Sequence, residues 1–585
     1  MYISKSKSKN VTIYYVCKSF RKDGGTSSKR VETLGTLEDI RRRCGAGEDP
    51  LEWARGYARE LTARDREQSR AVTLSLRPTL RMGMNERRLF NGGCLALAKV
   101  CRQLGLDRIC KAIEGRRGFG YDLWAVLSAL VCTRVLYPGS KLSSHAESRR
   151  LIGQPAFRLE HVYRALSVLA AESDYIQAAV YRNSLSALGR DTGVIYYDCT
   201  NFFFETEQAD GPGEGGAPGL RQYGVSKEHR PSPIVQMGLF MDRSGLPLAF
   251  CINPGNTAET KTLKPLERKL GADFGLSRCV VCTDAGLSSL ENRRFNNRGG
   301  RRYITVQSLK DRKIAPHLQQ WALDPGGWSV SGLGRTVTLF TDEAERLADR
   351  VLYKERWINE NGLEQRLIVT YSRKHALYQR QLRRQQVDRA LKAICSGTAR
   401  RRKKSPSDAS RFIAETHCTP QGEVADMTSY ALDTRAIERE ARFDGFYALC
   451  TNLEDEPALD IVRANAGRWE IEDMFRTLKT EFESRPVYLR RADRILAHFI
   501  TCFLALLVFK SLKRQLAGHD VTTAALRRHL VQMDYLKVWG EGYIPAFEAD
   551  EITTAIADFV SPELQNQIVT ERTMKQIVKS CVKVS

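Results

Sequence analysis

The sequence predicts an α/β protein in which a mixed sheet is flanked by helices. Residues 194–197, 279–283 and 303–306 are short, mainly apolar runs, and segments with helical spacing at 260–270 and 287–296 alternate with them. Strands that alternate with helices form a sheet with helices on its faces. At 585 residues the chain is too long for one compact core, so several domains are expected.

Successive stretches of different character divide the chain into expected parts. Strand-like runs with Gly-containing turns come first, and apolar residues at helical spacing follow them. A core of strands and helices is then interrupted by an insertion. The expected parts are 1–85 (β-rich), 86–190 (helical), 191–309 (first part of the core), 310–440 (β-rich insertion with a basic helical segment), 441–515 (second part of the core) and 516–585 (C-terminal helical region).

Several elements of the core and the insertion can be predicted individually. Residues 233–240 and 246–252 are expected to form a hairpin, and residues 328–340 alternate like a surface strand. A turn signal at 359–362 separates two further strands. The basic helical segment ends in the run 400–404, which fits a solvated linker at least as well as a phosphate contact.

The net charge narrows the class of partner. The chain holds 91 Lys and Arg against 68 Asp and Glu, a formal charge of +23. This excess favours a polyanionic partner, because neutralising phosphates releases bound counterions. A ribosomal or membrane surface fits the charge nearly as well, so the charge does not identify the reaction.

The cysteines and apolar stretches indicate a cytoplasmic protein. Most of the 15 cysteines lie in apolar runs, which is typical of reduced, buried thiols. Cys279 and Cys282 form a CxxC without a second pair at zinc spacing, so we interpret them as packing residues. The stretch 495–509 is shorter than the roughly 20 residues of a membrane span and predicts a buried helix. No apolar signal segment follows Met1, and we expect no membrane contact.

Three acidic residues stand in contexts that suit metal-dependent chemistry. Asp198 and Asp284 each follow an apolar, strand-like run, and Glu472 lies on a predicted helix. Carboxylates at strand ends, joined by one from a helix, can hold two Mg²⁺ ions for phosphodiester chemistry. Each residue also has a plainer explanation. An Asp after a strand often caps the next helix, and Glu472 can pair with Arg468 four residues earlier.

The helix around Glu472 has separate apolar and charged faces. The apolar stripe consists of Ile471, Phe475, Leu478 and Phe482. Arg468, Glu472 and Lys479 share a different face, which predicts one carboxylate between two cations. This arrangement fits a metal ligand flanked by groups that bind phosphate.

These residues resemble the DDE transposases of bacterial insertion sequences, in the group with a Tyr-x2-Arg-x3-Glu-x6-Lys signature. Arg468, Glu472 and Lys479 match the last three positions at the same spacing, whereas the Tyr position is occupied by Asn465. The further matching segments are 138–141, 197–200, 204–205, 224–230, 255–259 and 283–286. The resemblance covers residues 190–510 and extends more weakly toward the N-terminus.

The resemblance implies a ribonuclease-H-like catalytic core with a β-rich insertion between Asp284 and Glu472. It implies an enzyme that cuts at the ends of its own element and joins the 3′-hydroxyl ends to target DNA, through hairpin ends that are reopened. Asp198, Asp284 and Glu472 would bind two Mg²⁺ ions, with Mn²⁺ as a substitute. The implied partners are double-stranded DNA, as terminal inverted repeats and as target, and a second copy of the chain.

The resemblance also implies a set of DNA-binding residues. Arg468 and Lys479 would hold phosphates near the scissile bond. Asn465 can hydrogen-bond a phosphate but cannot stack on a base as Tyr can, and Trp469 is an aromatic residue close enough in sequence to compensate. A basic loop carries three further candidates, for which a plain surface loop is an equal explanation. They are Ser226, Lys227 and Arg230.

Two other functions fit the same residues. A metal-dependent nuclease would use the same carboxylates to cut DNA without joining it, although the Arg-x3-Glu-x6-Lys spacing and the large insertion favour transposition. A catalytically silent DNA-binding protein derived from a transposase is a further alternative, against which the presence of all three carboxylates argues. The helical region 86–190 either contacts DNA or forms a helical shell.

Overall fold

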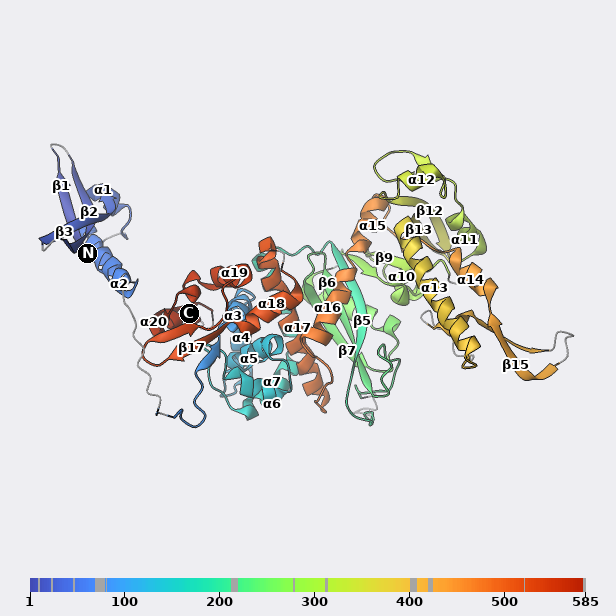
Figure 1. The fold of residues 1–585 in the computed structure, drawn as a ribbon, viewed down its shortest axis with the longest axis horizontal. Helices are drawn as coiled ribbons and strands as arrows, with labels where there is room; N and C mark the ends of the chain where they lie inside the picture. The colour runs from blue at the N-terminus through green and yellow to red at the C-terminus, as the bar shows by residue number, and fades with distance from the viewer. Residues whose placement is uncertain are drawn as a thin grey trace. The chain divides into compact units, whose positions relative to one another are not determined.

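The computed structural model divides the chain into two compact units. The units are Met1–Glu86 and Arg87–Ser585 (Figure 1). The described residues are 1–8, 11–22, 25–45, 48–68, 79, 81–211, 219–276, 279–310, 314–399, 408–418, 424–519 and 521–581. The basic run 400–404 lies outside these residues.

The first unit is a three-stranded antiparallel sheet with two helices against it. Its elements are β1 (Tyr2–Lys7), β2 (Thr12–Lys22), β3 (Gly25–Gly35), α1 (Leu37–Arg41) and α2 (Pro50–Gln68). The strand order is β1-β2-β3, so β2 is central. The buried residues of its small core are Val16, Leu34, Ile40, Ala54 and Ala58. Because these come from the sheet, α1 and α2, the helices cover one face of the sheet.

The second unit begins with helices that pack around one central helix. They are α3 (Cys94–Gln103), α4 (Leu106–Arg117), α5 (Leu123–Leu136), α6 (Lys141–Ser148), α7 (Leu159–Ala171) and α8 (Ser173–Leu188). The central helix α17 (Ala492–Gln515) contacts α3, α5 and α7. Its length and composition would allow it to cross a membrane, but most of it is buried within the protein, as predicted for 495–509. This helix is therefore part of the core.

A ten-stranded sheet dominates the described part of this unit. Its order is β11-β10-β12-β13-β16-β9-β8-β5-β6-β7. Its strands are β5 (Val194–Phe203), β6 (Ile234–Asp242), β7 (Pro247–Pro254), β8 (Val280–Thr283), β9 (Arg302–Gln307), β10 (Trp328–Val330), β11 (Thr336–Val337), β12 (Leu352–Glu360), β13 (Leu363–Tyr371) and β16 (Phe446–Thr451). β8 runs parallel to both β5 and β9, whereas β6 and β16 are antiparallel to their neighbours. The predicted mixed sheet flanked by helices is confirmed.

Two strands differ from their predictions. β5 continues to Phe203 instead of ending before Asp198, because residues 199–203 pair with residues 234–238 of β6. The stretch 328–340 is not one surface strand, since β10 and β11 are the short arms of a hairpin and Trp328 is fully buried. Alternation of polar and apolar residues alone does not distinguish these cases.

The segment between β9 and β16 extends the sheet and adds helices. Its other elements are α11 (Pro316–Leu323), α12 (Asp342–Arg346), α13 (Arg373–Cys395), β14 (Ile413–Cys418), β15 (Val424–Leu432) and α14 (Thr434–Ala441). The hairpin predicted about 359–362 is present as β12 and β13.

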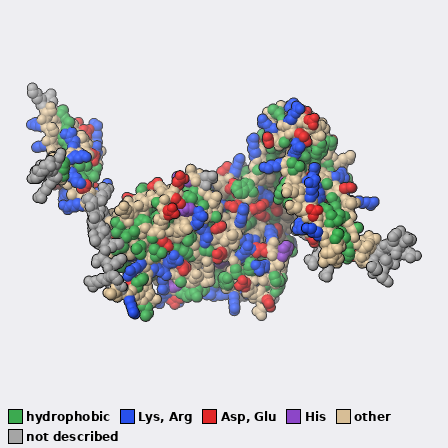
Figure 2. All heavy atoms as spheres, in the orientation of Figure 1, with side chains coloured by type: hydrophobic (Ala, Val, Ile, Leu, Met, Phe, Trp, Pro, Cys, Tyr) green, Lys and Arg blue, Asp and Glu red, His purple; other side chains and the backbone are tan. Residues whose placement is uncertain are grey.

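Lys and Arg side chains are spread over the face of the molecule that Figure 2 shows. The net charge therefore does not by itself locate a DNA-binding surface.

The C-terminal part contains strands as well as the predicted helices. Its elements are α18 (Thr523–Gln532), β17 (Asp534–Val538), β18 (Gly542–Pro545), α19 (Glu551–Val560), β19 (Val569–Thr570) and α20 (Glu571–Cys581). The strands form a sheet with β4 (Leu89–Asn91), in the order β19-β18-β17-β4. Strands this short, paired with a distant segment, leave little periodicity from which to predict them.

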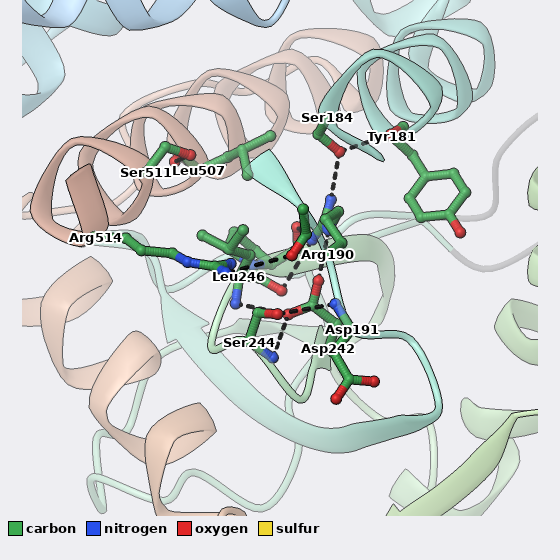
Figure 3. A network of polar contacts seen from close by, with 12 residues as sticks. Tyr181, Ser184, Arg190, Asp191, Asp242, Ser244, Leu246, Leu507, Ser511 and Arg514 are labelled. Atoms are coloured by element: carbon green, nitrogen blue, oxygen red, sulfur yellow. Dashed lines mark hydrogen bonds and ion pairs between the residues drawn. The ribbon is translucent and has the colours of Figure 1, made fainter. Parts of the chain in front are cut away.

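A buried ion pair ties the segment between α8 and β5 to the end of β6 (Figure 3). Arg190 Nε lies 2.5 Å from Asp242 Oδ2, and both side chains are 0% exposed. Arg190 also donates to Ser184 Oγ at 2.9 Å. Asp242 Oδ1 accepts the backbone N–H groups of Ser244 and Leu246, each at 3.0 Å. These bonds position the strand that carries Asp198.

Candidate active site

The parallel pairing of β5 and β8 brings the two predicted aspartates together. Tyr197 and Thr283 are register partners, and Asp198 and Asp284 are the residues that follow them. Asp198 lies in the middle of β5, where its Oδ1 accepts the N–H of Cys199 at 2.7 Å. Asp284 caps a short turn of 3₁₀ helix, η3 (Ala285–Leu287). Both carboxylates thus lie at one position along the sheet.

The pKa of Asp198 reflects both its burial and the neighbouring carboxylate. Burial raises the pKa of Asp198 to about 6, and the neighbouring Asp284 carboxylate adds to the increase. The cations of Lys227 and Arg468 act in the opposite direction. Two close carboxylates in a partly buried position repel each other and favour a bound cation.

The helix that carries Glu472 is held directly against β5. The chain passes from α15 (Ala458–Ala466) through Gly467 and Arg468 into α16 (Trp469–Arg476). The Tyr196 hydroxyl of β5 donates to the Ala464 carbonyl at 2.7 Å. A Cβ atom on Gly467 would lie 2.5 Å from the same hydroxyl, so only glycine allows this approach. Tyr196 therefore anchors α15 and α16 next to Asp198.

The Glu472 side chain is largely exposed and is paired with Arg468. It is 57% exposed, and its Oε1 lies 3.2 Å from Arg468 Nη1. The predicted apolar stripe on the other side of the helix is buried, as expected. Among the described residues, no group of three or more His, Cys, Asp and Glu side chains is arranged to hold a metal. Arg468 connects Glu472 with Asp198, because it pairs with Glu472 and its charge also lowers the pKa of Asp198 against the effect of burial.

The Lys479 side chain is largely buried, and the charge of Asp198 acts on its pKa. A π-helical turn, η5 (Thr477–Glu481), follows α16 and interrupts the regular helical spacing. The Lys479 side chain is only 14% exposed, and its ammonium lies 3.0 Å from Glu228 Oε1. Burial and the neighbouring Lys227 lower the pKa of Lys479 to about 8, against the opposing effect of Asp198. Lys479 and Glu472 therefore have different surroundings.

The loop 224–230 contains Glu228, the partner of Lys479, and also places Lys227 beside β5. Asn201 of β5 holds the loop by donating to the Val225 carbonyl at 3.0 Å. Lys227 donates to the Cys199 carbonyl at 2.6 Å and pairs with Glu259 at 2.9 Å. The resembling segments 224–230 and 255–259 are thus brought together. A Cβ on Gly224 would lie 2.0 Å from the Gly255 carbonyl oxygen.

The other two predicted loop residues have distinct surroundings. Ser226 Oγ accepts the N–H groups of Glu228 and Arg230, at 3.3 and 3.2 Å, so it shapes the turn. The Arg230 guanidinium lies 5.1 Å from the centre of the Phe203 ring. Of the three, Lys227 is the one whose charge acts on Asp198.

The side chain of Asn465, the residue at the signature Tyr position, is buried. It is 8% exposed, and its Nδ2 donates to the Tyr447 hydroxyl at 3.1 Å. Burial raises the pKa of the Tyr447 hydroxyl, and the nearby Arg468 cation opposes this increase. Tyr447 therefore completes a chain from Asn465 to Arg468, a role that no local motif indicates. Trp469, in contrast, is 61% exposed at the start of α16.

Comparisons with known proteins match about half of the chain to one family of domains. A family model described as a transposase DDE domain matches residues 211–508, about half of the chain. Among solved structures, the chain resembles a piggyBac transposase synaptic complex with hairpin DNA, with 8% identity, 84% of this chain and 85% of that chain covered, and a TM-score of 0.36. No curated protein matches the sequence. The family match includes Asp284 and Glu472, while Asp198 lies before it.

Proposed function

This chain belongs to the family of transposases with a DDE domain, and from that premise we propose that it cuts at the ends of its own insertion sequence. It then joins the 3′-hydroxyl ends to target DNA. The observation that carries the proposal is the register of β5 and β8, which sets Asp198 beside Asp284. The ten-stranded mixed sheet supports a ribonuclease-H-like core in which β10 to β15 form the insertion.

The two aspartates fit a divalent metal site. Carboxylate oxygens are the ligands that Mg²⁺ prefers. Burial and the neighbouring Asp284 raise the pKa of Asp198, and a bound cation would favour its charged form. In the proposed site Asp198, Asp284 and Glu472 would hold two Mg²⁺ ions, for which Mn²⁺ could substitute. Two bound ions would stabilise the attacking and leaving oxygens of a phosphodiester displacement. Glu472 would reach them by leaving its exposed pair with Arg468.

The cations around Asp198 are proposed to hold the DNA. Arg468 and Lys479 would hold phosphates near the scissile bond. The charges of Lys227 and Arg468 act on Asp198, and Asp198 in turn acts on Lys479. Exposed Trp469 is the aromatic residue available for stacking on a base. Asn465 would act indirectly, since its amide orients Tyr447 against Arg468.

The proposed sequence of steps is cut and paste through hairpin ends. Water attacks at the end of the element and releases a 3′-hydroxyl, which attacks the opposite strand to form a hairpin. The hairpin is reopened, and the freed 3′-hydroxyl attacks target DNA. Pairing two ends requires at least a dimer on double-stranded DNA, and the proposed setting is the bacterial cytosol at the nucleoid.

An excision assay tests this function. A marker flanked by the DNA from either side of the gene is introduced into cells, and wild-type protein or Glu472→Gln is supplied separately. Excision and reinsertion of the marker with wild type alone are expected. Cutting without reinsertion would indicate a nuclease, and absence of excision despite binding of the ends would indicate a silent DNA-binding protein.

A further inference from the structure

The sheet of the first unit has one face that its helices leave uncovered. Val16 and Leu34 point to the helices, and Tyr14 and Ile3 pack against the same core. Neighbouring residues along a strand alternate between faces, so Tyr15 belongs to the opposite face. Tyr15 is absent from the core cluster and stacks instead under Arg30, whose guanidinium lies 3.7 Å from the ring centre.

The strand register defines the composition of this uncovered face. Residues that are directly opposite across strands share a face. Tyr15 is opposite Ser4 and Thr33, and the rows on either side follow at intervals of two residues. These rows are Ser4, Tyr15 and Thr33; Tyr2, Cys17 and Arg30; Ser6 and Ile13; and Ser19 and Ser28.

Besides Ile13 and the buried Cys17, the uncovered face carries hydroxyl groups and one cation, and none of these residues is acidic. The acidic residue of β3, Glu32, lies on the helix side, where it accepts from Tyr57 at 2.9 Å and pairs with Arg43 at 3.1 Å. Lys18 likewise pairs with Asp65 of α2 at 2.6 Å. Arg30 is exposed and has no ion-pair partner in the part of the chain that the structure describes.

The charge of the unit matches a polyanion. Residues 1–86 contain 18 Lys and Arg against 11 Asp and Glu. Glu32 and Asp65 on the helix side are already engaged, whereas Arg30 and the Ser, Thr and Tyr hydroxyls of the uncovered face are placed to meet a ligand. Such groups are those that contact DNA phosphates and base edges.

We propose that this face, Tyr2, Ser4, Ser6, Tyr15, Ser19, Ser28, Arg30 and Thr33, docks into the major groove of double-stranded DNA and recognises the ends of the element. The major groove accepts β-strands as well as helices. The proposal rests on the proposed function, because it assumes that the DNA recognised is the element's own end.

The test uses the full-length protein and fluorescence anisotropy. The probes are a duplex with the DNA from one side of the gene and a scrambled duplex of equal length. Arg30→Ala is expected to weaken binding of the end duplex about tenfold, the effect of losing one good base or phosphate contact, and to reduce its preference over the scrambled duplex. Ser6→Asp, an exposed change on the same face, should act in the same direction. Arg59→Ala, an exposed cation on α2, is the matched control and should leave the preference unchanged.

The outcomes separate this inference from the proposed function. If Arg30→Ala and Ser6→Asp retain the wild-type preference while the end duplex is still bound and cut, the sheet is not the recognition surface and the transposase function stands. If wild type neither prefers nor cuts the end duplex, both ideas are wrong. If the two variants change only the oligomeric state, measured by light scattering, the face binds a second copy of the chain and not DNA.

Discussion

The ammonium of Lys479 lies 3.0 Å from Oε1 of Glu228, so the cation proposed to hold a DNA phosphate is paired within the protein. Arg485 forms an ion pair with the other oxygen of the same carboxylate. Lys227 has a corresponding partner in Glu259 at 2.9 Å. DNA binding at this site therefore requires phosphates to replace or join carboxylates that already neutralise the cations.

Removal of the Glu228 charge should strengthen DNA binding. In Glu228→Gln, phosphates no longer compete with a carboxylate for Lys479 and Arg485. Because a partly exposed ion pair contributes little free energy, the affinity for DNA should rise by roughly two- to fivefold. Anisotropy at low salt measures the effect. Glu481→Gln, which removes a similar charge from η5, is the control, and equal affinities for the two variants would contradict the prediction.

Loss of any one of the three carboxylates should abolish chemistry but not binding. Asp198→Asn, Asp284→Asn and Glu472→Gln are each expected to lower cleavage of end DNA more than about 100-fold, the upper effect of losing even an outer-shell metal partner. Cleavage of a labelled duplex with Mg²⁺ and its binding without metal are measured in parallel.

Glu470→Gln is the matched control for this series. Glu470 is on the same helix but faces the turn at Gly245, where a Cβ would lie 2.2 Å from its carboxylate, and this variant should remain active. Loss of binding in all three carboxylate variants would mean that they support the structure and do not hold metal.

The combined change Arg468→Ala and Lys479→Ala should weaken binding of cut ends and flatten its dependence on salt. Each lost phosphate contact lowers the slope of log K against log salt by about 0.9, so a decrease of roughly 2 is expected. Binding titrations from low to moderate salt give the slope. Arg463→Ala with Arg476→Ala removes two exposed cations from the neighbouring helices as a control, and an unchanged slope in the first pair would exclude phosphate contacts there.

Glu267 should make stability depend on pH. Its carboxyl lies in α9 (Leu263–Phe274), and burial raises its pKa to about 7, with Arg301 and Asn296 opposing the shift. Because the folded pKa exceeds the unfolded one, the stability that the protonated group contributes is complete below about pH 4.5 and is lost as the pH rises through 7.

The variant Glu267→Gln tests this dependence in thermal unfolding. It should match wild type at pH 5 and be more stable at pH 8.5 by about 1–3 kcal/mol, since each unit of pKa corresponds to 1.36 kcal/mol. Glu291→Gln, an exposed change on α10 (Leu290–Phe295), should show no such difference between pH 6 and pH 8.5. A stability gain from Glu267→Gln that is equal at both pH values would contradict the prediction.

Local patterns in the sequence were sufficient for several elements. The hairpin of β6 and β7 and the buried helix α17 follow from alternation, turn residues and unbroken apolar character. The buried stripe of Ile471, Phe475 and Leu478 follows from helical spacing. Each of these features depends on residues within one or two turns or strands, so the periodicity of the sequence predicts them.

The surroundings of the site residues depend on contacts between distant segments, which the periodicity of the sequence does not predict. Spacing predicted one face for Glu472 and Lys479, but Glu472 is exposed and pairs with Arg468, whereas Lys479 lies in the π-helical turn η5, is largely buried and pairs with Glu228. Asn465 was expected to meet phosphate, yet its amide bonds Tyr447 in the interior. Tyr447 itself lies in β16 and was not identified, because nothing in its own segment marks it as a partner of Arg468.

By itself, the sequence determined which residue types are available for the chemistry, in the carboxylates Asp198, Asp284 and Glu472 and the cations around them, and which short elements carry them. Only the tertiary structure decided that Asp198 and Asp284 are neighbours, through the parallel register of β5 and β8, and that Lys479 is paired with Glu228, 251 residues away. The physical reason is that strand pairing and buried ion pairs join distant segments, and their free energy depends on packing that no single segment contains.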